Sequence, residues 1–116
     1  MPDTEGHPAR AEMDLLTVLS ALADPLRYQV VTALLREPAG AERHCSSFGL
    51  PISKSTRAHH FRILREAGLI RQVDRGNSRK ARLRREDIES RFPGLLDLIA
   101  QNAPADDSSA PSRANH

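Results

Sequence analysis

The patterning of the chain changes at Gly68, from helical before this residue to strand-like after it. Over 54–67 the apolar residues recur at helical spacing, which predicts a helix of about 14 residues. Gly68 predicts the end of that helix, because glycine adopts the left-handed backbone of a C-cap at little cost. Residues 70–75 and 79–84 predict two strands, which the turn residues Gly76-Asn77-Ser78 join. The middle of the chain is therefore expected to be a helix followed directly by a β-hairpin.

Two helices are expected before this segment. Apolar residues at helical spacing predict the first over 13–23. Asp24 and Pro25 predict the start of a second helix, because aspartate caps the first turn of a helix and proline suits the first helical position. The second helix is therefore expected to run from Pro25 to about Arg36.

Two more helices complete the expected fold. A short helix is expected near 43–48, and a turn then leads to Ser53, which can cap the helix over 54–67. A final helix is expected over 86–100, with Pro93-Gly94 as a candidate interruption. These elements together predict a mainly α-helical fold with a small β-hairpin.

The 116 residues are expected to form one domain. Residues 1–11 and 101–116 lack hydrophobic periodicity and are rich in small, polar and acidic residues, so both ends are expected to be disordered. The folded domain is expected to span 12–100. A chain of this size buries only roughly 60% of its unfolded surface, so a second subunit is expected to cover its leucine-rich helices.

Positive charge is concentrated in the predicted helix and hairpin. Eleven of the 17 lysines and arginines lie between Lys54 and Arg85, and only Glu66 and Asp74 oppose them, which gives a local charge of +9. The whole chain carries +2. A field this one-sided concentrates a polyanion at one face of the molecule.

The order of elements matches a helix-turn-helix followed by a wing. In such a motif the second helix enters the major groove with its N-terminal residues on base edges, and cations on the helix and wing hold phosphates. Ser55, Thr56 and His59 are the candidates for base contact, because small polar side chains can approach the bases without collision. The expected DNA-binding residues are Lys54, Ser55, Thr56, Arg57, Ala58, His59, Arg62, Arg75, Arg79, Lys80 and Arg82.

Three stretches of the chain resemble a known family. They are Ala23-Asp24-Pro25-Leu26-Arg27, Ser53-Lys54-Ser55-Thr56-Arg57-Ala58-His59-His60-Phe61 and Leu64-Arg65-Glu66-Ala67-Gly68-Leu69-Ile70. They are similar to the signatures of the ArsR/SmtB-type winged-helix repressors, small bacterial homodimers that leave operator DNA when they bind a metal ion or another signal.

The resemblance covers about residues 13–100. It implies a winged helix-turn-helix regulator, a repressor, that binds a palindromic operator in double-stranded DNA and dimerises through its first and last helices. The expected interface residues are Leu15, Leu16, Leu19, Leu95, Leu98 and Ile99. The leucines at 15, 19, 95 and 98 could instead belong to the core of a single chain.

Two departures from the family pattern bear on ligands. The family often has an apolar residue at the place of Arg57, so this side chain is expected to reach outward or to touch the DNA backbone. Arsenic-sensing members carry a Cys-X-Cys pair in the third helix, and those places fall on Glu42 and His44, with Cys45 beside them. Zinc-sensing members use Asp and His ligands in the last helix, but 86–100 contain no histidine. No metal or other cofactor is therefore expected.

The same residues leave weaker alternatives for sensing. Glu42, His44 and Cys45 could ligate a borderline-soft ion if a second segment contributed, and Cys45 could instead respond to oxidation. The sequence identifies no inducer.

Other functions are open to a basic winged helix. It could bind RNA, but single strands usually stack on aromatic side chains, and the four aromatic residues, Tyr28, Phe48, Phe61 and Phe92, all lie outside the hairpin. It could also be an interaction module whose basic face meets an acidic protein. An enzyme is not expected, because the sequence has no glycine-rich phosphate loop, paired-carboxylate site or complete metal-ligand motif.

The expected location is the cytoplasm. Cys45 is the only cysteine, so no intramolecular disulfide can form, which suits a reducing compartment. No apolar run approaches the ~18 residues of a membrane span, and residues 1–10 lack a signal-peptide core. We therefore expect a soluble protein without a membrane association.

Overall fold

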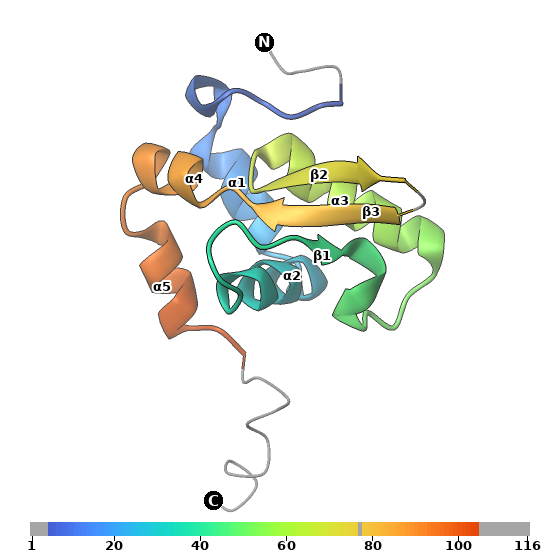
Figure 1. Cartoon of the computed structure of the whole chain (residues 1–116). Coiled ribbons are helices and arrows are strands. Elements are labelled where there is room, and N and C mark those ends of the chain that lie inside the picture. Colours follow the sequence, from blue (N-terminus) through green and yellow to red (C-terminus); the bar gives the residue numbers. More distant parts are fainter. Residues whose placement is uncertain (1–4, 77, 105–116) are drawn as a thin grey trace, which may run out of the picture.

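The computed structural model describes residues 5–76 and 78–104. Its elements in chain order are the 3-10 helix η1 (Arg10–Glu12), α1 (Leu15–Leu22), α2 (Pro25–Leu35), β1 (Arg43–His44), the 3-10 helix η2 (Cys45–Phe48), α3 (Lys54–Ala67), β2 (Ile70–Arg75), β3 (Ser78–Leu83), α4 (Arg85–Arg91) and α5 (Leu95–Gln101) (Figure 1). The predicted fold class, a mainly helical winged helix-turn-helix with a small β-hairpin, is confirmed.

Helix α3 has the predicted bounds because both of its ends are fixed by local chemistry. The Ser53 side chain accepts a hydrogen bond from the Thr56 amide at 3.2 Å and so caps the first turn. At the other end Gly68 has a φ of 92°, a left-handed conformation that favours glycine. The Gly68 amide donates to the Arg65 carbonyl, and the Leu69 amide donates to the Leu64 carbonyl. These two bonds end the helix and direct the chain into β2.

The break between α1 and α2 is also where the sequence predicts it. Asp24 accepts hydrogen bonds from the amides of Leu26 and Arg27, at 2.8 and 3.2 Å. Burial alone would raise the pKa of Asp24, but these two amides, together with the charges of Arg27 and His60, hold the pKa below its usual value. The Arg27 guanidinium then donates to the Ala21 carbonyl at 2.7 Å, which joins the start of α2 to the end of α1.

The wing contains a third strand that the sequence does not predict. Residues 43–44 form β1, which pairs with β3 in a sheet of order β1-β3-β2, and only 45–48 are helical, as η2. The predicted short helix near 43–48 is therefore corrected to a strand followed by a 3-10 turn. The Arg43 guanidinium lies 4.3 Å above the Phe48 ring, which joins this strand to η2.

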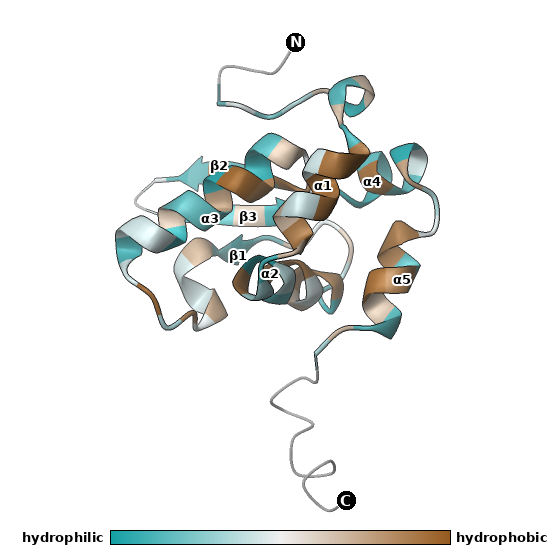
Figure 2. Ribbon diagram, turned by 180° about the vertical axis from the view of Figure 1, so that it is seen from behind, coloured by the Kyte–Doolittle hydropathy of each residue, from teal (hydrophilic) through white to brown (hydrophobic). Residues whose placement is uncertain are grey.

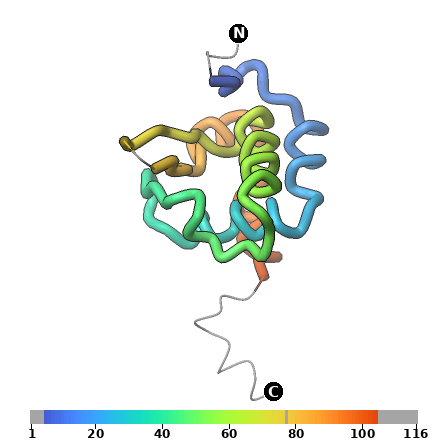
Figure 3. The backbone as a smooth tube through the Cα atoms, turned by 90° about the vertical axis from the view of Figure 1, so that its right-hand side faces the viewer, coloured from blue at the N-terminus to red at the C-terminus, as the bar shows by residue number. Residues whose placement is uncertain are grey.

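One face of the sheet packs against the helices, and the hairpin turn lies away from α1 (Figures 1 and 3). Phe61 and Leu64 of α3 are fully buried between the sheet, α1 and α2. The apolar core consists of Met13, Val18, Ala21, Leu22, Val30, Val31, Leu34, Cys45, Phe48, Phe61, Leu64, Ala67, Leu69, Ile70, Ala81, Leu83, Ile88, Leu96 and Ile99. This core fixes the outward orientation of the opposite face of α3.

The chain before α1 packs against the wing, although the sequence predicts disorder over 1–11. His7 is buried, and its Nε2 atom accepts a hydrogen bond from the Gln72 amide at 3.0 Å, on the edge strand β2. The Pro8 carbonyl accepts from Arg84 at 2.8 Å. Residues 5–11 therefore belong to the folded part of the chain, because they satisfy a strand edge and a buried guanidinium; 1–4 lie outside the described residues.

The final helical segment is two helices, α4 and α5, which separate at Pro93-Gly94 as the sequence suggests. Gly94 has a φ of 89°, so the reversal uses a left-handed residue. The Tyr28 hydroxyl donates to carbonyls of Ile99 and Asn102, at 3.3 and 2.9 Å, and ties the end of α5 to α2. Residues 101–104 of the segment expected to be disordered over 101–116 are therefore part of the described fold, and 105–116 lie outside the described residues.

Asp87 should make the free energy of unfolding depend on pH. Its carboxylate accepts from Arg10 at 2.8 Å and from Arg84 at 2.9 Å. Burial would raise the pKa of Asp87, but these two hydrogen bonds outweigh burial and lower it from 3.8. A lowered pKa stabilises the fold above the unfolded value of about 4, and this contribution is lost as pH falls through the folded value.

We therefore expect Asp87→Asn to reduce the free energy of unfolding at pH 7 by about 1 to 2 kcal/mol, and to flatten its decline below about pH 4. Denaturant titrations at several pH values measure both effects. Glu86→Gln is the matched control, because it removes the neighbouring exposed carboxylate. Equal pH profiles for the two variants would contradict this role of Asp87.

Candidate nucleic-acid interface

Helix α3 presents one polar face to solvent. Phe61 and its helical neighbours His60, Leu64 and Ala67 are buried, whereas Arg57 is half-buried at the boundary between the two faces. The exposed residues of the first turns are Lys54, Ser55, Thr56, Ala58, His59 and Arg62. The structure therefore brings the predicted helical contact residues together on one accessible face.

Hydrogen bonds between side chains order the beginning of this face. Ser53 donates from its hydroxyl to the Thr56 hydroxyl at 2.9 Å, and the Ser53 and Ser55 hydroxyls lie 3.3 Å apart. One turn later, the Arg62 guanidinium lies 3.4 Å from Nδ1 of His59. Thr56 is thus engaged by the cap, which leaves Ser55 and His59 as the better-placed groups for base contact.

His60 holds the helix rather than extending its contact face. Its ring is buried, and its Nδ1 atom lies 3.1 Å from the Arg27 guanidinium. Because Arg27 also binds the end of α1, this contact connects α3 to both preceding helices. The neighbours His59 and His60 therefore point in different directions and do not form a shared site.

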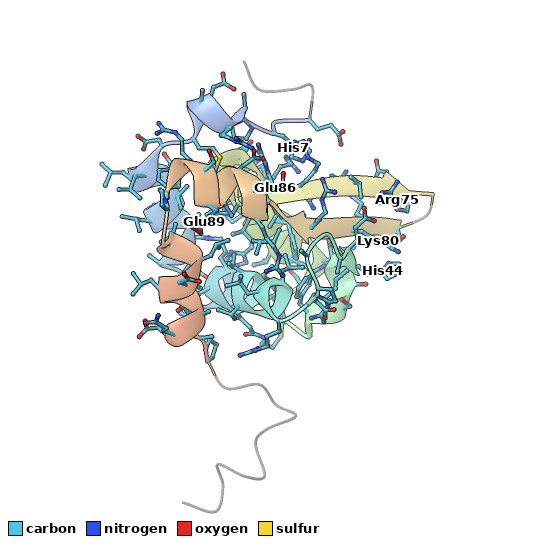
Figure 4. The ribbon with its side chains drawn as sticks, turned by 60° about the vertical axis from the view of Figure 1, so that its left-hand side comes forward. His7, His44, Arg75, Lys80, Glu86 and Glu89 are labelled. Atoms are coloured by element: carbon cyan, nitrogen blue, oxygen red, sulfur yellow. The ribbon has the colours of Figure 1, made fainter. Side chains whose placement is uncertain are left out.

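The cations of the wing lie on two faces of the sheet. Arg79 is two residues from the buried Ala81 along β3, so both lie on the face that packs against α3. Lys80 and Arg82 alternate with Arg79 and Ala81, so they occupy the opposite face. Figure 4 shows Lys80 near the turn end of the wing, beside Arg75 and His44. The predicted phosphate contacts of the hairpin are therefore not one surface.

Arg75 already has a carboxylate partner. Its guanidinium donates to both oxygens of Glu42, at 3.1 and 2.6 Å. The Arg75 side chain lowers the pKa of Glu42, and Glu42 in turn raises the pKa of Arg75. Glu42 is thereby bound to the wing, and Arg75 is less suited to a DNA phosphate than Arg79.

The weak metal candidates do not converge. Cys45 is buried, and burial raises the pKa of its thiol, which disfavours the thiolate that binds metals or reacts with oxidants. His44 is exposed, and Glu42 is engaged by Arg75. Within 5–76 and 78–104, no group of three His, Cys, Asp or Glu side chains could hold a metal ion.

Several arginines of the basic block support the fold instead of facing DNA. Arg84 is buried and bonded to Asp87 and Pro8. Arg85 donates to the carbonyls of Leu34 and Leu35, at 3.0 and 3.3 Å, and so caps the end of α2. The local charge of +9 therefore overstates the field available to a ligand.

The buried polar residue Gln72 is absent from the sequence predictions. Its amide group donates to Sγ of Cys45 at 3.5 Å, and its side-chain oxygen accepts from Arg65. Strand alternation with the buried Ile70 is the signal that could have placed Gln72 on the inner face. This contact links α3, η2 and β2 beneath the exposed face.

Four leucines form an exposed apolar surface on α1 and α5. Leu15, Leu16, Leu19 and Leu98 are 46%, 75%, 44% and 58% exposed. Leu95 is half-buried beside them, and Figure 2 shows the apolar colouring of α1 and α5 on this side. We call Leu15, Leu16, Leu19, Leu95 and Leu98 the leucine surface. Ile99, the sixth expected interface residue, is 5% exposed and belongs to the core of the single chain.

Known proteins share both this sequence and this fold. The chain is 30% identical over 84 residues to the uncharacterized HTH-type transcriptional regulator YceK of Bacillus subtilis, a match that covers 71% of this chain and 82% of YceK. The chain belongs to the HTH-type transcriptional regulators, and its fold is that of the ArsR-type winged helix-turn-helix proteins. No model of a known protein family matches it.

Solved structures agree with this ArsR-type fold. The crystal structure of the transcriptional repressor BigR from Xylella fastidiosa superposes with a TM-score of 0.58 at 19% identity, over 79% of this chain and 88% of BigR. An ArsR-like transcriptional regulator from a Rhodococcus species gives a TM-score of 0.55 at 24% identity, over 87% of this chain and 90% of that one. At these identities the likeness concerns the fold.

Membership of this family gives the chain its general role, that of a DNA-binding transcriptional regulator. In the described part of the chain, no helix is both long enough and apolar enough to cross a membrane.

Proposed function

We propose that this regulator is a repressor that binds a two-fold symmetric DNA site as a homodimer in the cytoplasm and releases it in response to an inducer. The observation that carries the proposal is the exposed N-terminal face of α3, capped by Ser53 and held from behind by Phe61 and His60. A helix fixed in this way can enter a major groove with its first turns on base edges.

The proposed base contacts are Ser55 and His59, with Ala58 allowing close approach. All three are exposed on the first turns of α3. Lys54, Arg57 and Arg62 lie on or beside the same face, so we assign them to phosphates together with Arg79 of the wing. Lys80 and Arg82 lie on the other face of the sheet, and we assign them no contact at the half-site read by α3.

The leucine surface is the proposed dimer interface. Burying a leucine side chain contributes about 1.5 to 3 kcal/mol, so an exposed group of leucines is stabilised by a partner with the same surface. A two-fold dimer would present two α3 helices about 34 Å apart, one helical turn of DNA, and so read two half-sites.

Selection of bound duplexes from random DNA tests the proposal. We expect enrichment of a pseudo-palindrome, with preferences that change at defined positions for Ser55→Ala and His59→Ala. Single-stranded RNA serves as competitor, since equal competition by RNA would support an RNA-binding module. Recovery of no duplex at low salt would contradict the proposal and favour an acidic protein partner.

The salt dependence of binding distinguishes the two faces of the wing. The slope of log affinity against log salt is negative, and each lost phosphate contact reduces its magnitude by about 0.9. Arg79→Gln should therefore flatten the slope by about 1.8 in a dimer, which loses two contacts. Arg82→Gln removes the same charge from the same strand on the opposite face, and should leave the slope unchanged. Affinities measured between about 50 and 200 mM salt give both slopes. The same slope for both variants would contradict the division of faces.

A further inference from the structure

A cavity of about 400 Å³ lies between the beginning of α3, η2 and the wing. Its volume is in the range of about 300 to 1,000 Å³ that is usual for small-molecule sites. Figures 1 and 4 show that these three elements lie at the end of the molecule opposite α4 and α5. The cavity is therefore separate from the leucine surface and adjoins the proposed DNA-binding face.

The inner wall of the cavity is apolar and fixed in position. Phe61 and Cys45, which are 1% and 9% exposed, belong to the core. Gln72 beside them is 5% exposed, with its amide nitrogen bonded to Cys45 and its oxygen to Arg65. Because the polar atoms of the Gln72 side chain already have partners within the protein, a ligand against this wall would make mainly apolar contacts.

The outer wall of the cavity is cationic. Lys54, Arg57 and Arg79 line it, and none of its lining residues is an aspartate or glutamate. Arg79 has a loose ion pair with Asp74, at 3.6 Å, and both side chains are largely exposed, at 44% and 65%. Arg57 is half-buried, and in the described part of the chain its guanidinium has neither an ion pair nor a hydrogen bond, since only its backbone amide is bonded, to the Ser53 carbonyl. A partly desolvated guanidinium of this kind is stabilised by an incoming anion.

We propose that the cavity is a regulatory site for a small organic anion with an apolar body, such as an aromatic carboxylate or sulfonate. The apolar part lies against Phe61 and Cys45, and the acidic group is held by Arg57 and Arg79. This inference rests on the proposed function in one respect: Lys54, Arg57 and Arg79 are also assigned to DNA phosphates. An anion in the cavity therefore competes with DNA for the same cations and releases the operator.

A DNA phosphate is the other source of an anion at this place. A phosphate carries no apolar group, so it would use the cationic outer wall and leave the Phe61 side unused. The two sources therefore differ in their dependence on the apolar part of the ligand.

A matched pair of fluorescent probes separates these possibilities in the absence of DNA. The anionic probe is 8-anilinonaphthalene-1-sulfonate, and the neutral probe is N-phenyl-1-naphthylamine, which has the same rings without the sulfonate. We expect the anionic probe to bind one site per chain, at least about tenfold more tightly than the neutral probe. We also expect Arg57→Gln to weaken anionic binding by about tenfold.

Arg82→Gln is the matched control, because it removes an arginine from the opposite face of the wing and should change probe affinity less than about twofold. Amide resonances in a nitrogen-15 correlation spectrum locate the probe, and those of Cys45, Ser46 and Gln72 should shift. Equal affinity of the two probes, equal effects of the two variants, or shifts confined to the leucine surface would each overturn the inference. If inorganic phosphate bound as tightly as the anionic probe, the cavity would be a phosphate-binding site only, and the inference would be overturned.

A second titration tests competition with a DNA duplex recovered by selection. We expect the anionic probe to lower the apparent duplex affinity in proportion to its occupancy, whereas simultaneous binding would overturn the regulatory role. The failures are distinguishable. Loss of probe binding with intact duplex binding removes this inference alone, whereas probe binding without any duplex binding removes the proposed function.

Discussion

Leu16→Glu should convert the regulator to a monomer at micromolar concentration and weaken operator binding by about 100-fold or more. Leu16 is 75% exposed in the single chain, so the change removes little from its own core. In a two-fold dimer the same change would bury two carboxylates in an apolar interface, which is strongly unfavourable. Sedimentation equilibrium gives the association state, and gel-shift titration gives the affinity.

The control for this prediction is Gln29→Glu, which introduces the same charge at an exposed position of α2 outside the leucine surface. This variant should remain dimeric with affinity close to that of the unmodified protein. A dimeric Leu16→Glu variant with full operator affinity would rule out the leucine surface as the interface.

Gly68→Ala should cost about 3 kcal/mol of unfolding free energy, because two penalties act at one residue. The φ of 92° at Gly68 is unfavourable for any residue with a Cβ atom. An added Cβ would also lie 2.7 Å from Cγ of the fully buried Met13. The variant should therefore lose stability and disturb the junction between α3 and β2.

Gly40→Ala separates the two penalties. Gly40 has a φ of 85°, but an added Cβ would have no atom within 4 Å, so only the backbone cost of about 1 kcal/mol is expected. Denaturant unfolding compares the two variants. Met13→Ala should partly relieve the added cost of Gly68→Ala, because it removes the colliding side chain. A Gly68→Ala cost no larger than that of Gly40→Ala would contradict the steric argument.

The sequence predicted those parts of the site that depend on neighbours along the chain. The cap at Ser53, the stop at Gly68 and the helix between them are local features, and the structure has them at the predicted residues. The break at Pro93-Gly94 is local for the same reason. Helix periodicity also indicated which residues of α3 face outward, because spacing along a helix fixes the face of each side chain.

The predictions failed where distant segments meet. Residues 43–44 have no strong preference of their own, and they form a strand because β3 offers a free edge. His7 lies in a stretch with the composition of a disordered end, yet it is buried by its bond to Gln72, 65 positions later. Composition describes average solvation of a segment, so it could not reveal these specific contacts.

The sequence by itself determined the helix-to-wing junction and the concentration of positive charge around it, because backbone conformation and charge follow from adjacent residues. Only the tertiary structure decided which cations serve a ligand. It paired Arg75 with Glu42, used Arg84 and Arg85 to hold the fold, and left Arg57 beside an apolar cavity. Every arginine has the same guanidinium group, so the sequence does not distinguish a structural arginine from one that binds a ligand. Only the partners that the fold brings within reach make that distinction.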